Sequence, residues 1–204
     1  MPEREPKKLV QAPLFPLPNV ILPPGTLVPL HVFEPRYRQM LAWTIERERL
    51  IAMALYDLHR GPDPDGTPAV HEIVGLGKVV DCVALEDGRS DLVLRGVMRC
   101  RIVAEDRSQP FRVATLEPLV SHASDPTEAV ALANMITARL GVQNPTPLVD
   151  ANGCSDVADK VLQILRLDVL TRQTIFATLD VNGRLRALHR LIDGLADRQL
   201  PEQN

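Results

Sequence analysis

Three arginines lie close together in the N-terminal half of this 204-residue sequence, in a spacing that could bind a ligand. Arg95, Arg99 and Arg101 fall within seven residues, on adjacent predicted strands or at their bend near Gly96. Guanidinium groups form paired hydrogen bonds with carboxylates, so these side chains could hold a carboxylate-bearing ligand. A solvated sheet face, or an arginine paired with Glu34, explains the same residues. The sequence favours these structural roles over a ligand clamp.

A second group of arginines recurs at helical spacing near the C-terminus. Arg184, Arg186 and Arg190 lie on the last predicted helix and could contact an acidic partner. A run of charges on an amphipathic helix is more typical of its solvated face, and we interpret the group in that way.

The local patterns that carry catalysis are missing from the sequence. Gly75-Leu76-Gly77-Lys78 lacks the upstream glycine and the following Ser or Thr of a phosphate-binding loop, and it lies in a predicted strand. The five histidines form no H-x-x-x-H or H-x-H pair, and neither G-x-S-x-G nor S-x-x-K occurs. The three cysteines are widely spaced and are interpreted as reduced, mostly buried thiols. We therefore predict that the protein is not an enzyme, with no catalytic residues, metal or cofactor.

Composition and charge exclude two further classes of protein. Lys and Arg number 23 against 26 Asp and Glu, and only 3% of the residues are aromatic. Neither a basic surface nor a stacking platform for nucleic acid is therefore expected. No stretch approaches the ~20 consecutive apolar residues of a membrane span. We predict a cytoplasmic protein that binds neither nucleic acid nor membrane.

The N-terminal half has the hydrophobic pattern of a β-rich domain with one helix. Nine of the 18 prolines lie in the first 35 residues, which indicates short extended segments at a sheet margin rather than central strands. A helix is predicted from Pro35, and apolar runs predict strands at 50–56, 73–85 and 111–119. Asp87-Gly88 predicts a type I′ hairpin turn. Many strands with short turns favour a compact, barrel-like domain.

The C-terminal half changes to the hydrophobic period of helices at residue 124, which predicts a bundle of about four helices. Asp125, Ser155, Asp168 and Asp180 are each expected to cap a helix start, Asp125 in a capping box with Glu128. A polar, proline-containing loop is predicted at 142–152. The predicted domains are therefore a β-rich domain at 1–122 and an α-helical bundle at 123–204.

Three segments resemble the N-terminal, substrate-binding domain family of Lon proteases: Leu14–Gly25, Leu30–Tyr37 and Asp87–Ile102. With a weaker likeness in the helical half, the resemblance covers roughly residues 10 to 198. It implies an α+β fold in which a PUA-like pseudo-β-barrel with one inserted helix precedes a C-terminal helical bundle. Full-length Lon proteases also contain an ATPase module and a Ser-Lys peptidase domain. This sequence shows neither and resembles the stand-alone bacterial members, to which the parent activity does not transfer by fold alone.

The resemblance implies a binding module that captures apolar segments of unfolded or partner polypeptides, at a sheet edge or in a groove between barrel and bundle. A separate protease or ATPase would act with such a module. The alternative is an enzyme or a small-ligand-binding protein whose site in that groove leaves no local motif. We expect at least one of Phe33 and Tyr37 to pack in the core. The candidate peptide contacts are Phe33, Arg36, Tyr37, Arg95, Arg99 and Arg101.

Overall fold

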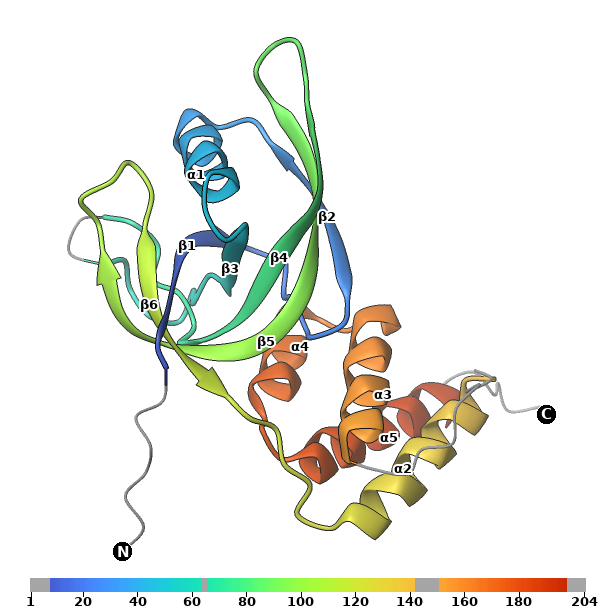
Figure 1. Cartoon of the computed structure of the whole chain (residues 1–204). Coiled ribbons are helices and arrows are strands. Elements are labelled where there is room, and N and C mark those ends of the chain that lie inside the picture. The colour runs from blue at the N-terminus through green and yellow to red at the C-terminus, as the bar shows by residue number, and fades with distance from the viewer. Residues whose placement is uncertain (1–7, 64–65, 142–150, 198–204) are drawn as a thin grey trace, which may run out of the picture. The chain divides into compact units, whose positions relative to one another are not determined.

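The computed structural model describes residues 8–63, 66–141 and 151–197, and the chain divides into two compact units. Unit 1 is Met1–Leu119 and unit 2 is Val120–Asn204. Within the described ranges, unit 1 contains six strands and one helix, and unit 2 contains four helices (Figure 1). The sequence placed the boundary at 122/123, and this division into two domains stays a prediction.

The strands of unit 1 form one mixed sheet that closes on itself. Their order is β2-β5-β4-β3-β1-β6, and β5 also pairs with β6, so five strands make a ring and β2 lies outside it. The length of β5 allows this closure, because its residues 90–95 pair with β2 and its residues 99–106 pair with β6. The elements are β1 (Val10–Leu17), β2 (Leu27–Val32), α1 (Pro35–Ile45), β3 (Leu50–Leu55), β4 (Ile73–Ala84), β5 (Ser90–Asp106) and β6 (Val113–Leu119).

The position of β1 corrects the expectation that the proline-rich segments lie at the sheet margin. β2 does lie at the edge, but β1 lies between β3 and β6 although it contains Pro13 and Pro16. The first half of β1, Val10–Pro13, pairs with β6, and the second half, Leu14–Leu17, pairs with β3. Each half has a strand partner on one side, so a proline is tolerated wherever its missing N–H faces the other side.

Alternate residues along the strands build two apolar cores, one on each face of the sheet. On one face, α1 packs against the strands through Met40 and Leu41, which join Phe15, Ile51 and Met53 in a single cluster. The opposite face carries shorter side chains, and its cluster includes Ala12, Leu14, Ala52, Leu76, Cys100, Ala114 and Leu116. Burial on both faces explains why the predicted strands are apolar at consecutive positions.

The hairpin turn between β4 and β5 differs from the predicted type I′ turn. The Gly88 N–H donates to the Leu85 carbonyl at 2.9 Å, and the Leu85 N–H donates to the Arg89 carbonyl at 2.8 Å. Gly88 has a φ of +79°, whereas Asp87 has no positive φ. The loop is therefore a type I turn followed by a left-handed glycine, which needs positive φ at one residue instead of two.

Unit 2 contains helices whose predicted caps are largely confirmed. Asp125 accepts hydrogen bonds from the N–H groups of Thr127 and Glu128, and Asp168 accepts one from Thr171 at 2.9 Å. Asp180 accepts from the Gly183 N–H at 3.1 Å at the start of the last helix. The helices are α2 (Pro126–Arg139), α3 (Ala151–Ile164), α4 (Val169–Ala177) and α5 (Val181–Asp197).

The predicted cap at Ser155 is wrong, because α3 begins at Ala151 and Ser155 lies inside it. Its Oγ instead accepts a hydrogen bond from the Arg184 guanidinium at 2.7 Å, and Arg184 also donates to Ser121 Oγ and to the Thr178 carbonyl. Arg184 is fully buried, so it does not belong to the predicted solvated face of the last helix. Burial is tolerated because oxygen acceptors surround the charge. Most of the predicted loop at 142–152 lies outside the described residues.

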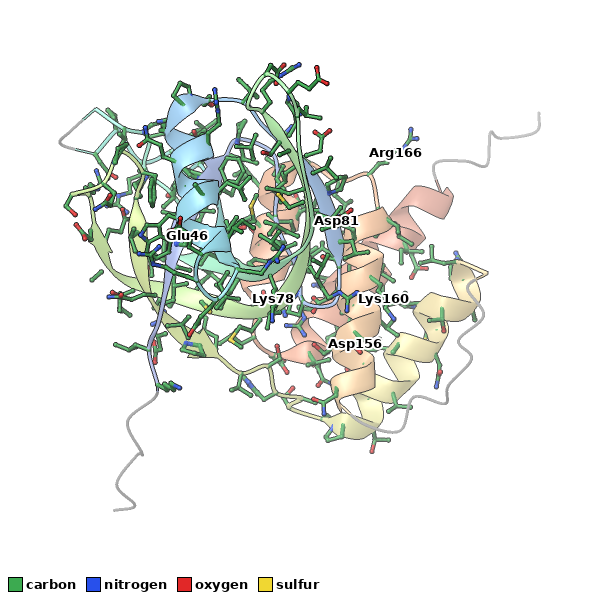
Figure 2. The ribbon with its side chains drawn as sticks, turned by 45° about the horizontal axis from the view of Figure 1, so that its top comes forward. Glu46, Lys78, Asp81, Asp156, Lys160 and Arg166 are labelled. Atoms are coloured by element: carbon green, nitrogen blue, oxygen red, sulfur yellow. The ribbon has the colours of Figure 1, made fainter. Side chains whose placement is uncertain are left out.

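The other arginines of α5 are exposed, as predicted. Arg186 donates through Nε to Glu128 Oε1 at 2.7 Å, so this pair joins α5 to α2. Glu128 also accepts a hydrogen bond from the Asn182 side chain. Its carboxylate thus contacts α5, whereas the sequence predicted that it would form a capping box with Asp125. On α3, Asp156 and Lys160 lie one turn apart on the exposed face (Figure 2).

Among residues 8–63, 66–141 and 151–197, no helix has the length and apolarity needed to cross a bilayer. In the same part of the chain, no three His, Cys, Asp or Glu side chains gather as metal ligands would.

Candidate functional site

A groove of about 510 Å³ opens in unit 1 beside the C-terminal end of α1. This end of the helix is capped at Glu46, which is labelled in Figure 2. Its volume falls in the range of ligand-binding pockets, roughly 300–1,000 Å³. The side chains that line it come from β1, α1, β3, β4, β5 and the residues next to them: Lys8, Leu9, Val10, Gln11, Trp43, Thr44, Arg47, Glu48, Leu50, Leu76, Val97 and Met98.

The groove lies where the ring of strands is incomplete. Val10–Pro13 of β1 pairs with β6, and the pairing of β1 with β3 begins only at Leu14. The start of β3, at Leu50 and Ile51, pairs with β4 on its other side. The N-terminal half of β1 and the start of β3 are therefore not joined as a ladder, and both line the opening between them.

Trp43 forms one wall of the groove and is held in place by its neighbours. The Arg47 guanidinium lies over the indole ring, 4.0 Å from its centroid, and Arg47 also donates to the Trp43 carbonyl at 2.9 Å. The indole and the Phe111 ring are arranged edge-to-face, with centroids 6.1 Å apart. Because Trp43 is the only tryptophan of the chain, its fluorescence reports on this groove.

The chemistry of the groove is an apolar floor with a mixed polar rim. Leu50, Leu76 and Met98 are buried or half-buried, and they belong to or pack on the core of the sheet face opposite α1. At the rim, Leu9 is 52% exposed and Val97 is 42% exposed. Charged groups of both signs surround them: Lys8, Arg47 and Glu48. Such a groove suits an apolar chain segment whose ends stay solvated.

The predicted contacts Arg36 and Tyr37 lie elsewhere, on a smaller pocket of about 130 Å³. Tyr37 is buried, and its ring centroid lies 4.5 Å from that of Phe15. The Arg36 guanidinium lies over the Tyr37 ring, 4.5 Å from its centroid. Burial raises the pKa of the Tyr37 hydroxyl far above its usual range, and neighbouring Tyr56 acts in the same direction. Arg36 pairs at 2.9 Å with Glu34 of its own turn. This corner therefore has the contacts of a packing site.

Two further arginines that line this small pocket each pair with a nearby carboxylate. Arg112 forms two hydrogen bonds of 2.7 Å with Glu105, and it donates to the Pro68 carbonyl at 3.1 Å. Arg107 pairs with Asp63. These contacts tie the loop before β4 to the connection between β5 and β6, so we assign them a structural role.

The remaining predicted contacts are not brought together. Phe33 is 58% exposed and stacks beside His31, with ring centroids 6.0 Å apart. Arg99 is buried, whereas Arg95 and Arg101 are exposed and lie opposite different strands, Arg95 beside β2 and β4 and Arg101 beside β4 and β6. Six residues of strand separate Arg95 from Arg101 by about 20 Å, and an irregularity of the ladder lies between them, so the three arginines do not form one clamp.

The groove residues were not predicted, because little in the sequence indicates that they lie together. Trp43 lies on a predicted helix, and Leu9, Val10 and Gln11 lie just before the proline-rich stretch. Their proximity depends on β1 changing partners from β6 to β3, which local hydrophobic periodicity does not encode. The proline at the change of partner, Pro13, was the one available sign.

The cysteines have the environment of structural thiols. All three are free, Cys100 and Cys154 are buried, and Cys82 is half-buried. Burial raises the pKa of Cys100 to about 11, which keeps this thiol protonated at neutral pH. Gly75-Leu76-Gly77-Lys78, the segment compared with a phosphate-binding loop, lies inside β4.

The ring of strands with one inserted helix, followed by helices, is the fold of Lon N-terminal domains. The structure matches the N-terminal domain of the Mycobacterium avium complex Lon protease with a TM-score of 0.70 and 18% identity, over 90% of this chain and 98% of the other. It matches the Lon N-terminal domain protein from Xanthomonas campestris with a TM-score of 0.64 and 24% identity, over 94% and 99% of the two chains. The predicted α+β fold is confirmed.

The sequence comparisons then identify the family. A family profile described as the ATP-dependent protease La (LON) substrate-binding domain matches residues 11–194, and the chain belongs to this family. The Lon protease of Citrifermentans bemidjiense is 29% identical over 147 residues, 67% of this chain and 18% of that protein. The Lon protease of Escherichia coli K12 is 23% identical over 207 residues, 96% of this chain and 26% of that protein. The chain thus spans about a quarter or less of these relatives.

Proposed function

We propose that this chain is a non-catalytic polypeptide-binding module that captures apolar segments of unfolded or partner polypeptides in the groove beside Trp43. The observation that carries the proposal is the groove itself, with its apolar floor of Leu50, Leu76 and Met98 and its charged rim. The family is defined by substrate binding, which agrees with a role in contact rather than chemistry. A separate protease or ATPase is the partner that this role calls for.

The size and chemistry of the groove favour unfolded clients. Apolar segments are buried in folded proteins and exposed in unfolded chains, so an apolar groove discriminates between the two states. Ordering a flexible client costs conformational entropy, and we expect dissociation constants that are roughly micromolar or weaker. Because the contact is mainly apolar, moderate salt should change the affinity little. Strong salt dependence would point to the exposed arginines, Arg95 and Arg101, as the contact.

Trp43 fluorescence provides a direct test with the whole chain. The probe is reduced and carboxymethylated pancreatic ribonuclease, an unfolded polypeptide without tryptophan, and the control is the same protein in its native form. We expect a saturable change in Trp43 emission with the unfolded form and none with the native form. No response up to the solubility limit would remove the proposal.

A matched pair of valine variants places the binding in the groove. Val97 and Val80 are 42% and 44% exposed, and each is the unpaired residue at an irregularity of the β4–β5 ladder. Val97 lines the groove and Val80 does not. Val97→Asp should weaken binding about tenfold, the effect of losing one valine contact of ~1.4 kcal/mol. Val80→Asp should bind like the parent, and an equal loss in both variants would contradict a groove contact.

A further inference from the structure

The hydrogen bonds of β1 show toward which side of the strand the N–H and C=O groups of each residue point. The Leu14 N–H donates to the Arg112 carbonyl at 2.8 Å, on the β6 side of the strand. The Leu17 carbonyl accepts from the Tyr56 N–H at 3.1 Å, on the β3 side. The main-chain groups alternate in direction from residue to residue along a strand. The N–H and C=O groups of even-numbered residues of β1 therefore point toward β6, and those of odd-numbered residues point to the other side.

Gln11 therefore presents its N–H and C=O on the side where β1 has no partner strand. Pairing with β3 begins at Leu14, three residues later, and Gln11 lines the groove. Leu9 has the same parity and also lines the groove. Pro13 has this parity too but carries no N–H, so it ends the row of donors. The free edge is thus short, and it faces the groove rather than open solvent.

The outer edge of the sheet, formed by β2, does not offer a central N–H group to an added strand. The Gly96 N–H donates to the Thr26 carbonyl at 2.9 Å, so even-numbered residues of β2 face β5 and odd-numbered residues face outward. Pro29 is the central outward-facing residue and has no N–H to offer. A proline at this position is a common protection against pairing with another chain. Compared with the β2 edge, the edge at Gln11 is the better acceptor for an added strand.

We propose that a polypeptide captured in the groove pairs with β1 as an added strand, through the main-chain groups of Gln11 and Leu9. This inference rests on the proposed function and names its mode of recognition. Every second side chain of the added strand would contact the apolar floor, while the backbone of the strand forms hydrogen bonds with β1. Main-chain groups are common to all sequences but are already paired in folded proteins. The recognised class is therefore any extended segment with alternate apolar residues and no proline at the paired position.

The test uses backbone methylation of the probe, which leaves the protein unchanged. The parent probe is a synthetic peptide in which leucine and serine alternate between terminal lysine pairs. Two derivatives carry N-methyl groups, one on every leucine and the other on every serine, so each blocks the donors along one edge of the extended peptide. A strand bound to β1 uses one edge. We expect one derivative to bind about tenfold more weakly and the other to bind like the parent peptide.

The outcomes separate this inference from the proposed function. If both derivatives bind like the parent peptide, or both weaken equally, the added strand is overturned, while the Trp43 response to the parent peptide still supports capture in the groove. If the parent peptide gives no Trp43 response, the proposed function itself fails.

A pair of variants at Gln11 tests the same contact from the protein side. Gln11→Pro removes the N–H that faces the groove, and Gln11→Ala removes only the side chain. We expect Gln11→Pro to bind the parent peptide about fivefold or more weakly than Gln11→Ala, which keeps the main-chain N–H. Equal binding by two variants that melt like the parent protein would overturn the inference. If Gln11→Pro is unstable, the methylated peptides decide the question alone.

Discussion

The Cα atom of Gly96 faces the carbonyl group of Pro23 so closely that a methyl group added at Gly96 would lie 2.0 Å from the carbonyl oxygen. The same crossing occurs on β4, where a methyl group at Gly75 would lie 2.1 Å from the Leu22 carbonyl oxygen. The segment between β1 and β2 therefore runs directly against the backbone of β4 and β5. Glycines at these positions are required for packing, which explains the glycine-rich stretch without a phosphate ligand.

The first prediction follows from this close approach. Gly96→Ala should lower the free energy of unfolding by about 2–3 kcal/mol, because the added methyl group forces the backbone at Pro23 to move. Gly61→Ala is the matched control, since nothing lies within 4 Å of a methyl group built there. That variant should change stability by less than ~0.5 kcal/mol. Urea unfolding of both variants measures the difference, and equal stabilities would show that the crossing segment is not tightly packed.

The second prediction separates the two aromatic residues of the strand-to-helix corner. Tyr37 is buried against Phe15, whereas Phe33 is 58% exposed. The expectation that at least one of them packs in the core is thus confirmed for Tyr37. Tyr37→Ala should cost ~3–5 kcal/mol through the cavity it leaves. Phe33→Ala should cost less than ~0.5 kcal/mol, as is usual for surface sites. Thermal melts read both effects, and a large loss for Phe33→Ala would show that this ring packs more closely than its exposure indicates.

Local sequence rules predicted the elements of this fold well, because helix starts and strand periodicity depend on neighbouring residues. Pro35 begins α1, and Asp125 and Asp168 cap their helices as expected. The strand pairs that close the ring were not predictable in this way. Closure requires β5 to pair with β6 beyond the point where its pairing with β2 ends, and these partners are chosen by packing over the whole unit.

The candidate site was harder to predict for a related reason. Three charged residues close in sequence, Arg95, Arg99 and Arg101, suggested a site, but Arg95 and Arg101 lie about 20 Å apart along β5, with an irregularity of the ladder between them. The groove gathers residues that are distant in sequence, such as Gln11, Trp43 and Val97. The ordered motifs of the sequence did indicate the family, and the family match covers residues 11–194.

The third prediction concerns the pH dependence of unit 2. Hydrogen bonds from Thr171 hold the pKa of Asp168 below its ordinary value, and the carboxylate caps α4. A carboxyl group whose pKa is lower in the folded state stabilises that state at pH values above its unfolded pKa of about 3.9. This contribution is lost as the pH falls through the lower, folded pKa. The stabilising effect of Asp168 should therefore be complete at pH 7 and should decrease below about pH 4.5.

Thermal melts of Asp168→Ala between pH 7 and pH 2.5 test this sign. The variant should melt below the parent at pH 7, and the difference in Tm should shrink as the pH is lowered, because protonation weakens the cap that the variant already lacks. Asp156→Ala is the matched control, since Asp156 is an exposed aspartate inside α3 and caps no helix start. It removes the same charge and should show a smaller loss at pH 7. A Tm difference for Asp168→Ala that stays constant or grows toward acid pH would contradict a stabilising role for the ionised cap.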